Sequence, residues 1–79
     1  MNMYIGNLNY RVKENELEHA LSAYGAVNSV KIVKDRETGK SKGFGFVEMD
    51  DRAAVQAIHE LNGSEFMGRQ LILREALPR

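Results

Sequence analysis

The chain has no cysteine, no net charge and no long hydrophobic run, and each absence excludes a class of protein. Without cysteine it can form neither disulfide bonds nor thiolate metal sites, and a reducing compartment suits it. No apolar run approaches the roughly 20 residues that a membrane-spanning helix needs, and the first residues, MNMYIGNLNY, lack the charged and then apolar layout of a signal peptide. We therefore expect a cytoplasmic protein with no membrane partner.

The charged residues balance in number but not in position. Lysine plus arginine and aspartate plus glutamate both number 11, which argues against a binder that works through bulk charge. Five basic residues fall between positions 31 and 42, whereas three glutamates cluster between positions 14 and 18. The five basic residues are Lys31, Lys34, Arg36, Lys40 and Lys42. We predict a neutral molecule with one basic side and one acidic side.

Length and hydrophobic patterning predict one domain, residues 1–79, with a single modest core. Short or alternating apolar stretches bounded by turn residues indicate strands, and apolar residues spaced i, i+3, i+4, i+7 indicate amphipathic helices. The expected order is a strand at 4–8, a helix at 14–24, strands at 27–33 and 42–49, a helix from 50 or 51 to 61, a short irregular link at 66–68 and a strand at 70–75.

The sequence signal for the end of the first helix is clearer than the signal for its start. Gly25 follows the apolar stripe, where a left-handed glycine cap would end the helix. At the start, Lys13 occupies the position at which a capping side chain is expected, so either Asn15 caps a later start or the helix begins weakly, at a cost of about 1 kcal/mol. The second helix has clearer signals, an aspartate pair at 50–51 and an Asn-Gly pair at 62–63.

The order of strands and helices predicts an α+β fold, the ferredoxin-like split βαβ sandwich (βαββαβ). In this fold a four-stranded antiparallel sheet carries both helices on one face. Because the helices cover only that face, the other face is open to solvent. Side chains that point away from the helices are therefore the candidates for binding.

The segment KGFGFVEM, residues 42–49, places two aromatic rings on the open face. Side chains alternate along a strand, so Phe44 and Phe46 share one face with Lys42. Tyr4 has the parity opposite to its apolar neighbours on the first strand and points the same way. Because the first and third strands are central neighbours in this topology, the three rings should lie together. The intervening glycines face inward, where we expect them to let a helix approach closely.

Three flat rings on an open sheet predict the binding of unpaired nucleic-acid bases. Every base has a π-face, and stacking one base on an aromatic side chain contributes roughly 1–3 kcal/mol. A closed duplex cannot readily engage such a surface, so the expected partner is single-stranded. Lys42, at the edge of the rings, is placed to reach a phosphate.

Two segments resemble the signature motifs of one family. Residues 42–49 resemble the octamer of the RNA recognition motif, and residues 3–8, MYIGNL, resemble its hexamer. The resemblance covers essentially the whole chain, and it implies that the three rings contact bases and sugars and that Lys42 contacts the RNA backbone. With no Gly-rich tail and no second copy of the motif, the chain is similar to the small bacterial members of the family that carry a single free-standing motif.

Two positions depart from the family pattern. Met49 replaces the usual closing aromatic residue of the octamer, and Lys13 replaces a frequent Ser or Thr cap. The parity of Met49 places it in the core, so these departures concern packing and the start of a helix rather than RNA contact.

Further contacts with RNA are expected from the basic stretch and from the end of the chain. We assign Lys31 and Lys40 to phosphate contacts, although a run of charges of this kind also serves as a solvated surface turn. Arg74 points outward on the last strand. The segment from Ala76 to the last residue either extends across the sheet to contact RNA or frays.

The expected function is the binding of single-stranded RNA, two to four bases at a time, by a monomer that takes part in post-transcriptional regulation. Single-stranded DNA stays open as a partner, because a 2′-hydroxyl contact cannot be placed from the sequence. The alternative is a protein-interaction module that uses the same sheet face. We expect no catalysis, metal or cofactor, because His19 and His59 lie on different helices and no serine has a base at a readable spacing.

Overall fold

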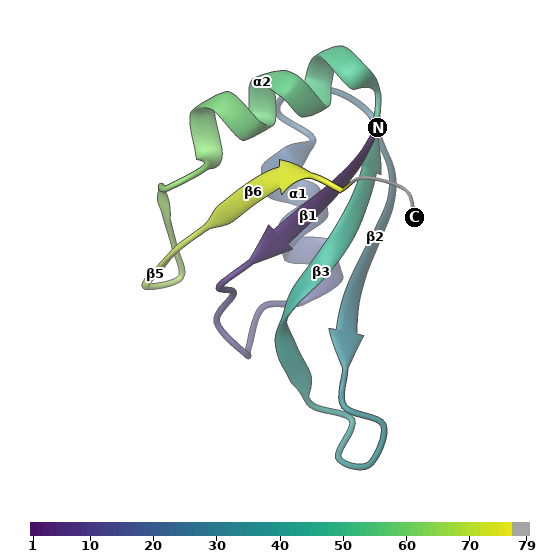
Figure 1. Cartoon of the computed structure of the whole chain (residues 1–79), viewed down its shortest axis with the longest axis vertical. Coiled ribbons are helices and arrows are strands. Elements are labelled where there is room, and N and C mark those ends of the chain that lie inside the picture. The colour runs from purple at the N-terminus through teal and green to yellow at the C-terminus, as the bar shows by residue number, and fades with distance from the viewer. Residues whose placement is uncertain (77–79) are drawn as a thin grey trace.

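The computed structural model describes residues 1–76, which form a four-stranded antiparallel sheet, two helices and a small hairpin. The sheet runs in the order β2 (Val27–Lys34), β3 (Ser41–Met49), β1 (Asn2–Gly6), β6 (Ile72–Glu75). The helices are α1 (Glu14–Leu21) and α2 (Asp51–Leu61), and the hairpin consists of β4 (Glu65–Phe66) and β5 (Arg69–Gln70). In Figure 1, α1 lies behind the sheet and α2 across its upper end, so no helix of the described chain covers the face toward the viewer. The predicted βαββαβ fold is confirmed.

The inward face of the sheet and the apolar stripes of both helices share one core. Alternation places Met3 and Ile5 of β1 inside with Val47 and Met49 of β3, each at most 1% exposed. The other buried apolar residues are Leu8, Val12, Leu17, Leu21, Ile32, Ala53, Ala54, Ala57, Leu71 and Leu73. Burying each larger side chain contributes about 1.5–3 kcal/mol. Met49 thus packs in the core, as its parity predicts, and no polar or charged side chain among residues 1–76 is buried beside it.

The first helix starts at Glu14, so the later start capped by Asn15 is wrong, and the helix ends earlier than expected. Lys13 stands at the N-cap, and the carboxylate of Glu16 accepts a hydrogen bond of 3.0 Å from the Lys13 backbone N–H. The helix ends at Leu21. The predicted glycine cap is wrong, because Gly25 has a φ of 157°, far from the left-handed helical region. A Cβ on Gly25 would lie 2.6 Å from that of Ala53, so this glycine instead lets the loop pack closely against α2.

Gly43 and Gly45 make room for a strand and a loop rather than for a helix. Both are buried. A Cβ on Gly45 would collide with the backbone of β2, and a Cβ on Gly43 would lie 3.0 Å from the ring of Tyr10 and 3.3 Å from the carbonyl oxygen of Leu8. The prediction that these glycines admit a helix is therefore wrong. Their close neighbours belong to the adjacent strand and to the loop that follows β1.

The segment between α2 and β6 is more regular than the sequence predicts. The two short strands β4 and β5 pair with each other, and the residues between them, Met67 and Gly68, have φ values of 50° and 85°. Two successive positive φ values are what a two-residue hairpin turn of type I′ requires. The predicted irregular link at 66–68 is thus part of a β-hairpin. Beyond it Leu71 and Leu73 point into the core, as predicted.

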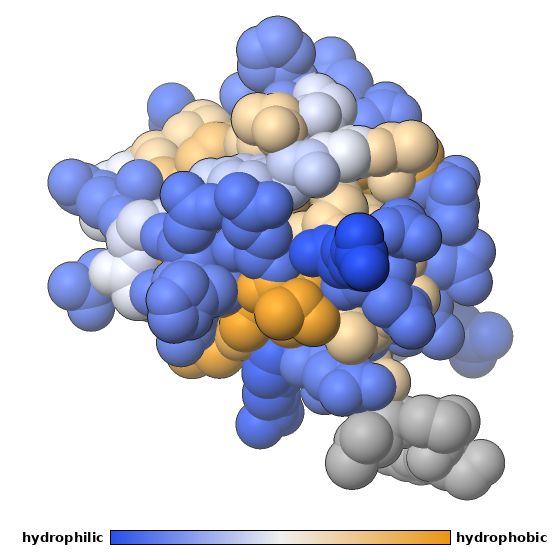
Figure 2. Space-filling view, turned by 90° about the horizontal axis from the view of Figure 1, so that it is seen from above, coloured by the Kyte–Doolittle hydropathy of each residue, from blue (hydrophilic) through white to orange (hydrophobic). Residues whose placement is uncertain are grey.

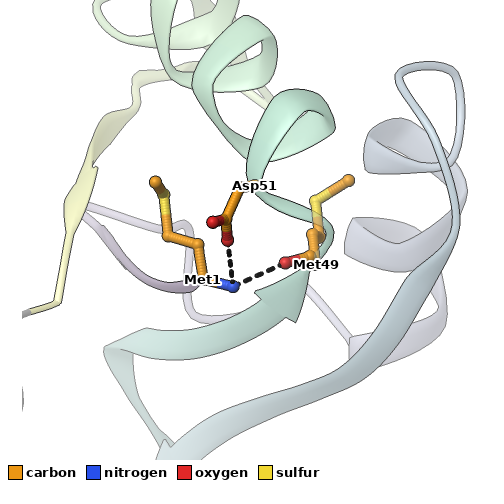
Figure 3. Close-up of polar contacts among 3 residues, drawn as sticks. All are labelled: Met1, Met49 and Asp51. Atoms are coloured by element: carbon orange, nitrogen blue, oxygen red, sulfur yellow. Dashed lines mark hydrogen bonds and ion pairs between the residues drawn. The ribbon is translucent and has the colours of Figure 1, made fainter.

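The start of β1 is joined to the corner between β3 and α2 (Figure 3). The α-ammonium group of Met1 donates to the carbonyl oxygen of Met49 at 2.8 Å and lies 3.0 Å from a carboxylate oxygen of Asp51. The backbone N–H of Met49 donates in turn to the Met1 carbonyl at 3.1 Å. Because the Asp51 side chain is 81% exposed, the ion pair contributes at most about 1 kcal/mol. Asp50, at the N-cap of α2, makes no capping bond with its side chain.

The solvent side of α2 is mainly hydrophilic. Figure 2 shows a hydrophobic patch surrounded by hydrophilic side chains when the molecule is seen from above. Val55 of α2 is 56% exposed, while the buried residues of this helix are Ala53, Ala54 and Ala57. Val55 therefore offers an apolar reference position on the helix side of the sheet.

Among residues 1–76 no helix is long and apolar enough to cross a membrane.

Candidate nucleic-acid interface

Three aromatic side chains, Tyr4 of β1 and Phe44 and Phe46 of β3, meet on the helix-free face of the sheet, and we call them the aromatic cluster. The antiparallel register pairs Tyr4 with Phe46. The ring centroids lie 5.9 Å apart for Tyr4 and Phe44, 6.0 Å for Tyr4 and Phe46, and 6.3 Å for the two phenylalanines. The structure thus brings together the three rings that strand parity and strand order predict to be neighbours.

The aromatic cluster is open to solvent and yet held in place. Phe46 is 42% exposed, and Tyr4 and Phe44 are partly buried. Phe44 and Phe46 meet edge to face at 89°, and a pair of this kind contributes about 0.5–1.5 kcal/mol beyond its buried area. The Tyr4 ring lies over Gly6, where an added Cβ would come 2.5–2.8 Å from three atoms of the Tyr4 side chain. Contacts within the sheet face therefore bring the rings together before any ligand arrives.

Basic side chains border the aromatic cluster on both sides. Arg74 of β6 stands opposite Tyr4, and its guanidinium carbon lies 4.8 Å from the centroid of the Tyr4 ring, which is a cation–π geometry. Lys31 of β2 stands opposite Phe46. Lys42 precedes the cluster on β3, and all three cations are exposed. Positive charge is thus available along the edges of an apolar centre.

Two of the predicted contact residues lie away from the aromatic cluster. Lys40 is exposed in the loop between β2 and β3. Ala76 follows β6 and donates its backbone N–H to the carbonyl oxygen of Asn2 at 2.8 Å. Ala76 therefore continues alongside β1 rather than crossing the open face. The predicted path of residues 77–79 lies outside the described residues.

Asp35 organises the loop that presents Lys40. Its carboxylate accepts hydrogen bonds from the backbone N–H groups of Thr38 at 3.1 Å and Glu37 at 2.8 Å. These backbone donors, with a smaller contribution from the charge of Lys42, hold the pKa of Asp35 below its ordinary value of 3.8. The backbone N–H of Asp35 also donates to the Lys40 carbonyl at 2.7 Å. The hydrogen bonds that shape the loop therefore favour the ionised form of Asp35.

Arg69 and Asn7 are among the side chains beside the aromatic cluster that the predictions from sequence missed. The Nη2 atom of Arg69 donates to Oδ1 of Asn7 at 2.7 Å, and Nδ2 of Asn7 donates to the Gln70 carbonyl at 2.7 Å. Both residues line a hollow of about 200 Å³ together with Tyr4 and Phe44. The β4–β5 hairpin brings Arg69 here, and the Met-Gly pair of its turn was the available signal in the sequence.

Comparison with known proteins identifies the family. The chain belongs to the RNA recognition motif family, and the family model matches residues 3–72. It is 49% identical over 80 residues to RbpE of Nostoc sp. (strain PCC 7120), an alignment that covers all of this chain and 81% of that protein. The crystal structure of RNA binding protein PG1 is 59% identical, with a TM-score of 0.96, over 100% of this chain and 96% of that chain. The structure of the Rna15 RRM with bound RNA (GU) is 30% identical, with a TM-score of 0.84, over 95% of this chain and 81% of that chain.

These matches confirm the resemblance that the octamer and the hexamer carry, and the fold class with it. The matched residues 3–72 include both motifs and both helices. The roles of the individual side chains in contact with RNA stay predictions.

Proposed function

We propose that this chain binds single-stranded RNA, two to four nucleotides at a time, by stacking bases on the aromatic cluster. The observation that carries the proposal is the presence of three rings, with centroids at most 6.3 Å apart, on a sheet face that no described helix covers. Two similar structures support it. PG1 is named as an RNA binding protein, and the Rna15 RRM structure contains bound RNA.

The angles between the rings suit two kinds of contact, one with bases and one with a sugar. Tyr4 and Phe44 are tilted by 30° to each other, so both offer a face to neighbouring bases. Phe46 is perpendicular to Phe44, which suits a contact with the sugar between two bases. Two stacked bases contribute roughly 2–6 kcal/mol before the strand is ordered, at about 1–3 kcal/mol each. One such surface therefore binds weakly.

Arg74 already occupies the Tyr4 ring in the unbound protein, and a base has to replace it. An exposed cation–π contact is worth about 0.5–1 kcal/mol, which is less than the roughly 1–3 kcal/mol of a base stack. The exchange is favourable if the guanidinium moves from the ring to a phosphate of the arriving strand. Arg74 thus keeps the ring covered until RNA binds and then contributes a phosphate contact.

The remaining phosphate contacts come from Lys42 and Lys31, with Lys40 at the periphery. Ala76 borders the face beside β1 and offers no phosphate contact, because its backbone N–H is bonded to Asn2. The positions of the cations on both sides of the aromatic cluster let the backbone of the strand run past the rings while the bases face the sheet. A monomer with one weak surface of this kind acts on a transcript through several copies or with a partner. Post-transcriptional regulation is the role we propose for it.

The test is an NMR titration of backbone amides with a pool of short random RNA oligomers. Wild-type protein is compared with the Phe44→Ala, Phe46→Ala double variant and with Val55→Ala, which removes an exposed apolar group from the helix side. We expect shifts that follow β1 and β3 in the wild type and in Val55→Ala. We expect no shifts in the double variant, provided that its amide spectrum remains that of a folded protein.

If the same face binds a protein instead of RNA, the NMR titration gives a different result. A protein-interaction module would show no shifts even at millimolar RNA. Shifts centred on α1 and α2 would mean that RNA binds the helix side, and the proposal would then be wrong.

A further inference from the structure

A basic hollow lies between the loop that precedes α1 and the loop that joins β2 to β3. Its volume is about 630 Å³, within the range of sites that hold small ligands. Among the described residues that line it, four are cations and one, Glu14, is acidic. The cations are Arg11, Lys13, Lys34 and Lys40. The hollow therefore attracts an anionic ligand.

Tyr10 gives this hollow an aromatic wall. The side chain is 66% exposed and packs into no core, although its loop is well ordered. The backbone N–H of Leu8 donates to the Gly43 carbonyl at 2.8 Å, and Oδ1 of Asn9 accepts from the N–H of Arg11 at 2.9 Å. The ring rests beside Gly43, where an added Cβ would lie 3.0 Å from it. An ordered loop thus presents a large flat ring to solvent.

The basic hollow is adjacent to the aromatic cluster. Tyr10 also lines the hollow of about 200 Å³ that Tyr4, Phe44, Lys42 and Arg69 line. Tyr10 therefore stands between the two hollows, where a strand that leaves the cluster can meet it. The aromatic cluster, Lys42 and Tyr10 thus offer a ring, a cation and a second ring. An RNA strand offers the matching groups, which are a base, a phosphate and a second base.

We propose that the basic hollow is a second nucleotide site for the same RNA strand, with a base stacked on Tyr10 and its phosphates at Lys34 and Lys40. The inference rests on the proposed function, because the strand arrives from the aromatic cluster. An apolar peptide would leave the cations unpaired, and free phosphate would leave the ring without a contact. A nucleotide satisfies both, since it carries a π-face and a charged phosphate. If this segment were only a solvated surface turn, its charges would be explained but the exposed ring of Tyr10 would not.

The experiment compares two random-sequence RNA pools of different length, about three and about eight nucleotides, in the same NMR titration. The shorter pool fits the aromatic cluster alone, and the longer pool reaches the basic hollow. We expect shifts at residues 10–13 and 39–41 with the longer pool only. Tyr10→Ala should weaken binding of the longer pool on the order of tenfold, because one base stack is lost, and should affect the shorter pool less. The Lys34→Gln, Lys40→Gln double variant should act in the same direction.

Further variants distinguish failure of the second site from failure of the proposed function. Tyr10→Phe retains the ring and should bind the longer pool like the wild type, and Val55→Ala removes an exposed apolar group elsewhere as a matched control. If Tyr10→Ala binds both pools normally while the Phe44→Ala, Phe46→Ala variant loses the shorter pool, the second site does not exist and the proposed function stands. If that double variant still binds the shorter pool, the proposed function itself fails. Equal weakening by Tyr10→Phe and Tyr10→Ala would overturn the stacking contact.

Discussion

Gly6 and Gly45 are both buried on the central strands, and they serve different neighbours. At Gly6 an added Cβ would meet the end of the Tyr4 side chain, which is flexible. At Gly45 it would meet the backbone of Lys31 and Ile32, which cannot move without disturbing the pairing of β2 with β3. The same substitution should therefore alter ligand binding at one position and folding at the other.

We predict that Gly6→Ala weakens RNA binding with little loss of stability. Gly6 has no positive φ, so alanine meets no backbone strain, and the Tyr4 ring can swing aside to admit the methyl group. The displaced ring loses part of its base stack, at a cost on the order of 1 kcal/mol in binding. NMR titration with random RNA gives the affinity, and urea unfolding gives the stability. Unchanged affinity together with an unmoved Tyr4 ring would contradict the prediction.

Gly45→Ala is the matched contrast for this experiment. Overpacking against a backbone costs about 1–3 kcal/mol of folding free energy, and here the obstructing atoms belong to the next strand. Its midpoint in urea should fall well below that of Gly6→Ala. Equal midpoints for the two variants would show that the position of the clash does not decide the outcome.

Among the elements, the β2–β3 loop contains hydrogen bonds that we expect to respond to pH. Backbone donors to the Asp35 carboxylate lower its pKa below 3.8, so the folded loop favours the ionised form. The stabilising contribution is therefore complete above pH 3.8 and is lost as the pH falls through the lower pKa of the folded protein. We predict that the amide signals of Glu37 and Thr38 move below pH 3.8, as measured by NMR across an acid titration.

Asp35→Asn separates this effect from general acid unfolding. The amide oxygen can still accept the two backbone hydrogen bonds, but it does not titrate. In this variant the same amide signals should stay in place until the whole protein unfolds. Parallel movement in the variant and in the wild type would assign the change to another carboxylate.

Most of the secondary structure was predictable because its signals are local. Side-chain alternation gave the inward and outward faces of β1 and β3, and helical spacing gave the buried stripes of both helices. One error arose where distant segments meet. The role of Gly25 depends on Ala53, which is 28 residues away in the sequence, and no local pattern reveals that contact.

The candidate site divides in the same way. Tyr4, Phe44 and Phe46 could be placed together because strand order follows from the fold and parity follows from the sequence. Tyr10 and Arg69 could not be placed from the sequence, because both lie outside the four strands of the main sheet. Their positions at the site depend on the geometry of a loop and of a hairpin. A loop residue carries no periodic signal, so its direction becomes known only when its hydrogen bonds are known.

At the scale of the whole molecule, RNA binding has to come from local charge, because the formal net charge is zero. The cations around the aromatic cluster lie on three different strands, and they are Lys31 of β2, Lys42 of β3 and Arg74 of β6. The glutamates of the first helix lie in α1, which is on the other side of the sheet (Figure 1). A strand of RNA that approaches the open face therefore meets three cations beside the rings.

We predict a salt dependence that reflects those three cations and not the net charge. Each phosphate contact with a single strand contributes a slope near −0.7 to the logarithm of affinity against the logarithm of salt, so three give about −2, or roughly a 20-fold loss for a fourfold rise in salt. Fluorescence anisotropy with a short labelled oligomer over a salt series measures the slope. Lys42→Gln should reduce it by about 0.7, whereas Arg52→Gln, an exposed cation on α2, should leave it unchanged. A slope near zero in the wild type would mean that the open face holds its ligand by apolar contact alone, which is the behaviour of a protein-interaction surface.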